Sequence, residues 1–221
     1  MNGYMKPQDI EKRSFEIITA EMGERTFPAG IAEVVKRVIH TTADFDYADS
    51  LAFSPDVIEQ AKAALAAGAT VVTDTNMALS GVSKATLAKL GGKAVCLMAD
   101  EQVASEAKAR GVTRAVVSME HAAKFEGPLI FAIGNAPTAL IRLHELIEEG
   151  IVAPALVIGV PVGFVNVIES KENIFAVCEK HHVPAIVAFG RKGGSTIAAA
   201  VCNALIYSAA EMLDPTARGW K

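Results

Sequence analysis

The stretch that decides the fold is Pro128-Leu-Ile-Phe-Ala-Ile133 followed by Gly134-Asn-Ala-Pro-Thr138. Its first half is a short apolar run that ends at a turn, which is typical of a strand buried on both faces of a parallel sheet. In its second half Gly134 makes the turn and Pro137 opens a helix. We expect this helix to run to Glu149 and to stop at Gly150. Strand, turn and helix together form the repeating unit of an α/β protein.

The same unit recurs along most of the chain. Short apolar runs alternate with helical stretches of about ten to fifteen residues, a pattern that predicts right-handed βαβ crossovers. The expected strands are 70–73, 93–98, 114–118, 128–133, 155–160 and 184–189, and the last helix follows 190–195. We therefore predict the α/β class: a three-layer domain with a mostly parallel, doubly wound sheet.

Helices precede this sheet. One begins near Pro7, with Ile10, Ser14, Ile17, Ile18 and Met22 on its apolar stripe. A second runs from Pro28 to about residue 42, and residues 44–47 then look extended. A further helix begins at 54–56. We expect one domain over residues 1–221, with 214–221 as a loose tail.

Composition restricts the classes of function. The chain has 221 residues, 51% of them apolar but only 6% aromatic, which suits a parallel sheet packed by Ala, Val, Ile and Leu. Its net charge of −4 argues against nucleic acid or an anionic membrane as partner. Cys96, Cys178 and Cys202 are widely separated, as in a reduced cytoplasmic protein. We expect no signal peptide and no membrane span.

His40 is the candidate catalytic residue. Ile31, Val34, Val35, Val38 and Ile39 form the apolar stripe of the second helix, and at 100° per residue His40 falls on its far side. It also lies in the last turn, where unpaired carbonyls favour an imidazolium, so the position suits a proton donor near neutral pH. A solvated histidine at a helix end is the simpler alternative.

Four polar or glycine-rich turns should meet at the carboxyl edge of the sheet, where open α/β sheets bind ligands. They are 74–76, 134–138, 159–164 and 190–195. Glycine beside a helix start leaves N–H groups that can hold an anion, and Arg191 and Lys192 add charge. Such turns are also what βα connections ordinarily need. The segments lack nucleotide-binding spacing, no metal-ligand set can be assembled, and 169–172 looks like a charged helix face.

Six segments in order give the chain a specific resemblance to the precorrin-8X and cobalt-precorrin-8 methylmutases of corrin biosynthesis. The segments are 10–18, 37–42, 74–81, 134–139, 159–166 with 169–172, and 190–194. The resemblance implies an isomerase that moves a methyl group from C-11 to C-12 of the tetrapyrrole to give (hydrogeno)cobyrinate. His40 would be the proton donor, and no cofactor or metal would be needed.

The resemblance also implies a homodimer with its active site near the subunit interface. Ser14 and Arg37 would contact the substrate, and the apolar body of the ring would stack on residues such as Met77, Leu79, Val162 and Phe164. The expected substrate-binding set is Ser14, Arg37, Thr41, Thr42, Asp74, Asn76, Asn135, Thr138, Gly163, Phe164, Arg191, Lys192 and Gly193.

Two other functions stay open at this point. One is a non-catalytic tetrapyrrole carrier that binds the corrinoid and hands it on. The other is a nucleotide-dependent enzyme on the same α/β scaffold, which the missing nucleotide fingerprints disfavour. The sequence leaves open whether the ring is metal-free or holds cobalt.

Overall fold

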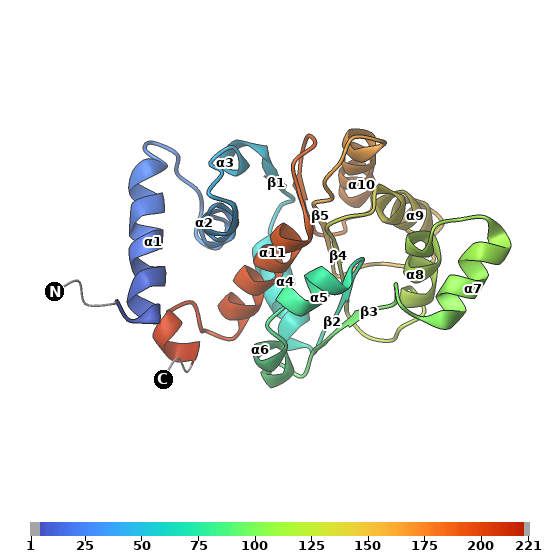
Figure 1. Ribbon diagram of the computed structural model, residues 1–221, viewed down its shortest axis with the longest axis horizontal. Coiled ribbons are helices and arrows are strands. Elements are labelled where there is room, and N and C mark those ends of the chain that lie inside the picture. Colours follow the sequence, from blue (N-terminus) through green and yellow to red (C-terminus); the bar gives the residue numbers. More distant parts are fainter. Residues whose placement is uncertain (1–4, 219–221) are drawn as a thin grey trace.

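The computed structural model describes residues 5–218 (Figure 1). The helices are α1 (Pro7–Glu21), α2 (Ile31–Thr42), α3 (Tyr47–Ser50), α4 (Val57–Ala66), α5 (Asn76–Gly81), α6 (Lys84–Lys89), α7 (Glu101–Arg110), α8 (Arg114–Ala122), α9 (Pro137–Glu148), α10 (Val167–Lys180), α11 (Ser195–Ala209) and the 3₁₀ helix η1 (Pro215–Arg218). The strands are β1 (Leu51–Phe53), β2 (Thr70–Thr73), β3 (Lys93–Cys96), β4 (Leu129–Ile133), β5 (Leu156–Gly159) and β6 (Ala185–Ala188).

The strands form a six-stranded sheet in the order β1-β6-β5-β4-β2-β3. Five strands are parallel, and β1 pairs antiparallel with β6 at one edge. The chain builds outward from β2 to β3 on one side and from β4 to β6 on the other, so the sheet is doubly wound. The direction of winding reverses between β2 and β4, and this is the switch point of the sheet.

Alternate residues of each strand face opposite helical layers. Ile130 and Ile158 pack with α4 and α11 on one face of the sheet, while Phe131 and Val157 pack with α8, α9 and α10 on the other. The strands are buried on both faces, which explains why they read as continuous apolar runs. The three-layer α/β prediction is confirmed.

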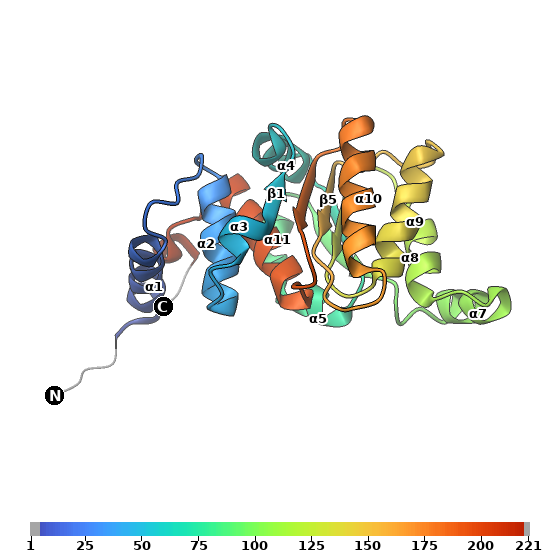
Figure 2. The same ribbon diagram turned by 90° about the horizontal axis from the view of Figure 1, so that it is seen from above.

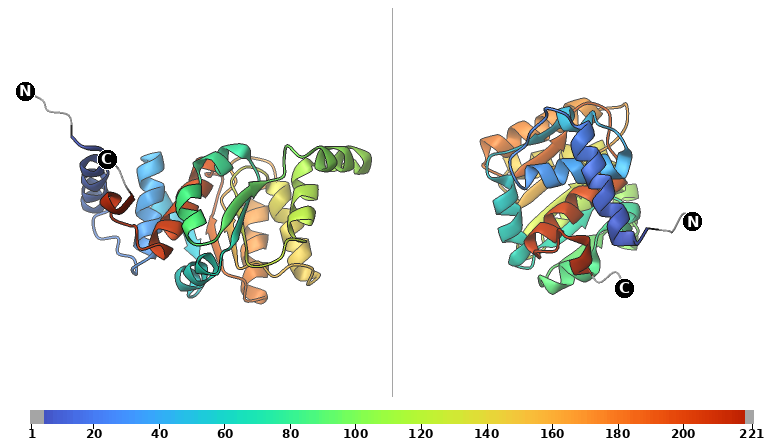
Figure 3. Two further views of the ribbon diagram at one scale, coloured as in Figure 1. Left: turned by 90° about the horizontal axis from the view of Figure 1, so that it is seen from below. Right: turned by 90° about the vertical axis from the view of Figure 1, so that its left-hand side faces the viewer.

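Helices α1 and α2 lie at one end of the molecule, beyond β1, and α7 lies at the other end (Figure 2). Figure 3 shows α1 and the short η1 turn beside each other at that outer end. Helix α2 begins at Ile31, three residues after the expected Pro28, because Gly30 takes a positive φ and its N–H bonds the Glu33 carboxylate. Within residues 5–218, no helix has the length and apolar character to cross a membrane.

Three sequence expectations were wrong, and one strand was not expected. Residues 114–118 belong to helix α8, which Thr113 caps, and are not a strand. Residues 44–47 form a turn that leads into α3, and β1 follows it as a strand that the sequence did not reveal. The 214–221 tail is not loose up to residue 218, because η1 forms there; residues 219–221 lie outside the described part.

The apolar stripe of α1 is also rotated from the expected one. Ile18 and Met22 are buried as predicted, but Ile10 and Ile17 are exposed. Phe15 packs against the core in their place. Helix α1 therefore buries the face that carries residues 11, 15, 18 and 22, at helical spacing, and leaves a second apolar strip uncovered.

Candidate active site

His40 is exposed in the last turn of α2, whereas Val34, Val35, Val38 and Ile39 are buried. The expected orientation of the helix is confirmed. Ala43 adopts a left-handed conformation and ends α2, its N–H donating to the carbonyl of Ile39 at 2.7 Å. His40 thus stands at the carbonyl end of a helix, which carries partial negative charge.

A hollow of about 240 Å³ between α1 and α2 contains His40 in its wall. Ser14, Ile17, Ile18, Glu21, Ile39, Ala43 and Phe45 complete the lining. The ring of Phe15 lies 5.2 Å from the His40 ring and is tilted by 34° to it. Ser14 and His40, which are far apart in the sequence, therefore share one cavity.

The Ser14 hydroxyl donates to the carbonyl of Ile10 at 2.8 Å, one helical turn earlier. This back-bond accounts for a hydroxyl on that face of the helix. The oxygen keeps lone pairs that can accept a further hydrogen bond at the hollow.

Arg37 is held in a paired cluster beside the hollow. Its guanidinium donates to Glu11 at 2.8 Å and lies 5.2 Å from each of the Phe15 and Tyr207 rings. Arg218 donates to both oxygens of the same carboxylate, at 2.8 and 2.9 Å. Burial raises the pKa of Glu11, but the two arginines outweigh it and hold this pKa below its usual value. Two guanidiniums thus share one carboxylate.

The two threonines after His40 bond to their own helix. The Thr41 hydroxyl donates to the carbonyl of Arg37, and that of Thr42 donates to the carbonyl of Val38, both at 2.9 Å. Thr42 also accepts from the N–H of Asp44 at 3.2 Å. Thr41 is exposed and Thr42 half-buried, so Thr41 is the more open to a ligand.

Asp74 follows β2 at the switch point of the sheet and is completely buried. Its carboxylate accepts the N–H groups of Gly134, Asn135 and Ala136 at 2.9, 2.8 and 2.6 Å. Burial raises the pKa of this carboxyl, against the three hydrogen bonds. The sequence pattern predicts that the N–H groups before α9 are free for an anionic ligand. This prediction is wrong, because the protein's own Asp74 carboxylate occupies them. Asp74 supports the loop and has no surface for a substrate.

The remaining polar candidates after β2 and β4 are of two kinds: two are exposed, and one is bonded to another helix. Asn76, the first residue of α5, and Asn135 are exposed at the carboxyl edge. Thr138 bonds the Thr113 hydroxyl at 3.0 Å and so connects α9 to the start of α8. It points to a structural contact rather than to the hollow beside His40.

The loops after β5 and β6 are hydrogen-bonded to each other. The N–H of Gly194 donates to the carbonyl of Val160 at 2.8 Å, and that of Gly163 donates to the carbonyl of Arg191 at 3.2 Å. A side chain at Gly193 would collide with the carbonyl oxygens of Val160 and Pro161. Glycine at 193 is needed for this close approach.

Lys171 binds the backbone of the loop after β6. It lies on α10 with its side chain fully buried, and its ammonium donates to the carbonyls of Gly190 and Lys192, both at 2.8 Å. The expected charged helix face at 169–172 is therefore wrong at this position. Lys171 was missed because nothing in the local pattern distinguishes a buried lysine from an exposed one.

An exposed apolar surface lies on these loops. Phe164 is 84% and Val165 77% exposed, and Val162 in the same loop is exposed as well. Met77, in the first turn of α5, is a further exposed apolar residue. The Arg191 guanidinium lies 5.6 Å from the centre of the Phe164 ring. An aromatic face with a cation on it can contact both the plane and the anionic rim of a flat ligand.

Lys192 joins this edge to the end of the His40 helix. Its ammonium donates to Asp44 and Asp46, each at 2.6 Å. The hydrogen bond from Lys192 lowers the pKa of Asp44 and raises that of the lysine. Lys192 is thus already paired in this structure, unlike the free cation expected from the sequence.

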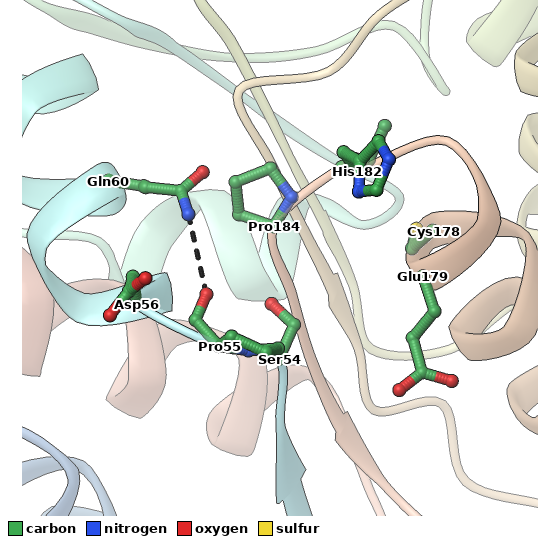
Figure 4. Close-up of a pocket in the computed structure, with 9 residues that line it drawn as sticks. Ser54, Pro55, Asp56, Gln60, Cys178, Glu179, His182 and Pro184 are labelled. Carbon is green, nitrogen blue, oxygen red and sulfur yellow. Dashed lines mark hydrogen bonds between the residues drawn. The ribbon is translucent and has the colours of Figure 1, made fainter.

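A separate pocket of about 390 Å³ opens at the amino edge of the sheet (Figure 4). Pro55, Gln60, Glu179 and His182 are among its lining residues, and Gln60 donates to the carbonyl of Pro55 at 3.3 Å. It contains none of the predicted site residues. Over the described residues, no three His, Cys, Asp or Glu side chains are grouped as metal ligands.

Fold and site together define an α/β protein with an exposed histidine at the end of α2 and an exposed, apolar, cation-bearing sheet edge that Lys192 connects to the end of that helix. Comparison with known proteins identifies the family. A family model described as precorrin-8X methylmutase (CbiC) matches residues 9–208. The chain belongs to this family. It is therefore a methylmutase, an isomerase of cobalamin biosynthesis.

The relatives cover nearly the whole chain. It is 46% identical over 201 residues to the cobalt-precorrin-8 methylmutase of Priestia megaterium, covering 91% of this chain and 88% of that protein. Identity to the precorrin-8X methylmutase of Pseudomonas aeruginosa is 39% over 198 residues, covering 90% and 94%. The crystal structure of precorrin-8X methylmutase from Thermus thermophilus matches with a TM-score of 0.84 at 40% identity, covering 92% of this chain and 97% of that one.

Proposed function

We propose that this chain moves the methyl group from C-11 to C-12 of a precorrin-8-type ring, with His40 as the proton donor. Protonation of the conjugated ring draws electron density away from the migrating group and lowers the barrier, and one placed acid typically contributes about 10²–10⁴ in rate. The observation that carries the proposal is the exposed His40 imidazole, set in a hollow together with Ser14.

The exposed edge of the sheet fits the two parts of such a substrate. The ring is flat and apolar, and Phe164, Val162 and Met77 offer an exposed apolar surface. Its acetate and propionate rim needs cationic donors, and Arg191 lies on the Phe164 ring. Asn76 and Asn135 add exposed amides at the same edge. We include Gly163 and Gly193 in the binding set through the loops that they build, and Lys192 as a second cation for the rim.

Arg37 would turn from Glu11 to a substrate carboxylate when the ring binds. Arg218 makes two hydrogen bonds to Glu11, so this carboxylate keeps a partner after Arg37 leaves. Arg37 and His40 are three residues apart and both contact Phe15, so a ligand that reaches one passes close to the other. Thr41 and Thr42, in the last turn of α2, would each contribute a hydroxyl.

We further propose that the active unit is a cytoplasmic homodimer of this single domain. The hollow beside His40, about 240 Å³, is smaller than the roughly 300–1,000 Å³ of sites that enclose drug-sized ligands, and a tetrapyrrole is larger still. Ile10 and Ile17 remain exposed on α1, and Ile17 lines the hollow. A second copy packed on this strip would deepen the site.

The direct test is turnover. Purified protein is incubated with precorrin-8X, and in parallel with the cobalt-containing ring, while the visible spectrum is followed for formation of the corrin. A catalytic number of turnovers per chain supports the proposal. Stoichiometric binding without conversion would instead identify a tetrapyrrole carrier.

Asp74 argues against the nucleotide-dependent alternative. Doubly wound folds bind nucleotides at the switch point, where helix N-termini hold phosphates. Here the Asp74 carboxylate already occupies the N–H groups before α9 and would repel a phosphate. Millimolar NAD or ATP should therefore leave the melting temperature unchanged, while the corrinoid should raise it.

A further inference from the structure

Lys171 is a buried charge that the proposed reaction does not use directly. Its side chain is fully buried, and the hydrogen bonds of its ammonium go to two backbone carbonyls, those of Gly190 and Lys192. Burial lowers the pKa of this lysine to about 8, so most of it is charged at pH 7. Stability alone does not explain such a residue, because replacing a buried charge by an apolar side chain is often neutral or stabilising.

The two carbonyls that Lys171 binds lie on either side of Arg191. The bonded segment is therefore short, and fixing both ends leaves its backbone little freedom. The loop is held on its other side by the Gly194–Val160 and Gly163–Arg191 hydrogen bonds. Arg191 and Lys192 project from this fixed backbone, Arg191 to the Phe164 ring and Lys192 to Asp44 and Asp46.

We propose that Lys171 is a positioning residue for the methyl shift: its buried ammonium fixes the 190–192 backbone so that Arg191 and Lys192 meet the acidic rim of the ring. This inference rests on the proposed function. It assigns Lys171 no contact with the substrate, since a fully buried side chain has no surface to offer. Its effect should therefore appear mainly in substrate binding and act through the two cations.

The first experiment replaces Lys171 by methionine, which fills similar space without a donor, and compares steady-state kinetics. We expect Lys171→Met to raise KM for precorrin-8X at least about tenfold while kcat falls less than about threefold. Glu172→Gln is the control for a neutralised charge at an exposed position of the same helix, because Glu172 is the next residue on α10 and is exposed; the charge that it removes has the opposite sign. It should leave both constants unchanged.

A double-mutant cycle separates positioning from a general structural role. In an Arg191→Met, Lys192→Met background the cations are gone, so adding Lys171→Met should change kcat/KM less than twofold. Additive losses would overturn the proposal, as would an unchanged KM in a folded Lys171→Met protein. If Lys171→Met does not fold, Lys171→Gln takes its place. Its amide reaches less far, and wild-type kcat/KM for it would equally overturn the proposal.

Turnover by the wild-type protein distinguishes a failure of the proposed function from a failure of the proposed role of Lys171. If the wild type does not convert the substrate, the proposed function is wrong. If the wild type turns over normally and the cycle is additive, only the role of Lys171 is wrong.

Discussion

Glu11 is the residue whose removal should have the largest effect on the outer end of the molecule. Its side chain is 14% exposed and accepts from Arg37 and Arg218, whose side chains are 13% and 7% exposed. Glu11→Gln should lower the free energy of unfolding at pH 7 by about 2–3 kcal/mol, because hydrogen bonds to charged groups are lost while both guanidiniums stay buried. Urea denaturation followed by circular dichroism measures this difference.

The stabilisation that Glu11 provides should decrease as pH falls. The pKa of Glu11 is lowered in the folded state, so its stabilisation is present above the unfolded pKa, about 4.3, and is lost as pH falls through the folded value. The gap between wild type and Glu11→Gln should therefore close below pH 4. Glu16→Gln, which removes an exposed pair with Arg13, is the control and should cost less than about 1 kcal/mol.

Lys171 should also make stability rise with pH, but in the alkaline range. Its pKa is lowered to about 8, from about 10.4 for an unperturbed lysine. Between these values the unfolded chain binds a proton that the folded chain does not, so stability rises with pH. We expect the unfolding free energy of wild type, measured relative to that of Lys171→Met, to increase by up to about 3 kcal/mol between pH 8 and 10.5. A flat difference would mean that the lysine is not charged and desolvated as described.

Helical periodicity was sufficient to predict that His40 is exposed, because a polar residue off an apolar stripe is a local pattern. The partners of Arg37 and Lys192 were not predictable in the same way. Glu11 is 26 residues from Arg37, and Asp44 is 148 residues from Lys192. Which carboxylate meets which cation is decided by how helices pack, and one sequence does not encode that visibly.

At the scale of elements, Asp74 connects β2 to the start of α9. Asp74→Ala leaves three N–H groups before α9 without their acceptor, and should lower the free energy of unfolding by at least about 3 kcal/mol. Asp100→Ala is the matched control, since Asp100 caps α7 at an exposed position and should cost about 1 kcal/mol. Urea denaturation measures the loss of unfolding free energy in each variant. Equal losses would show that the buried Asp74 carboxylate stabilises the fold no more than an exposed N-cap does.

The strands and most of the helices of the sheet were predictable because each is a buried apolar run or follows one. Residues 114–118 were misread because Ala, Val and Val in a short run fit a buried helix as well as a strand. Strand β1 has three residues, too few for any period to appear. The rotated stripe of α1 has a physical cause too: its partner surface is α2, and the sequence alone does not show that Phe15 faces it.

At the scale of the whole molecule, the exposed strip on α1 predicts the oligomeric state. Ile10→Glu with Ile17→Glu should convert a dimer into a monomer and lower turnover at least about tenfold, because charges replace the apolar strip beside the His40 hollow. The fold should survive, since Ile18 and Met22 hold the other side of the helix. Sedimentation equilibrium gives the mass, and exposed Arg13→Glu on the same helix is the control. A monomeric, fully active wild type would contradict the dimer.

The proposed reaction depends on proton transfer by His40, and the most direct test compares wild type with His40→Asn in single-turnover conversion of precorrin-8X. We expect a rate at least about 10²-fold lower in His40→Asn, with the corrinoid product still bound as tightly as by wild type, because one acid is removed and the rest of the site is kept. A His40→Asn protein that converts the substrate at close to the wild-type rate would contradict this expectation.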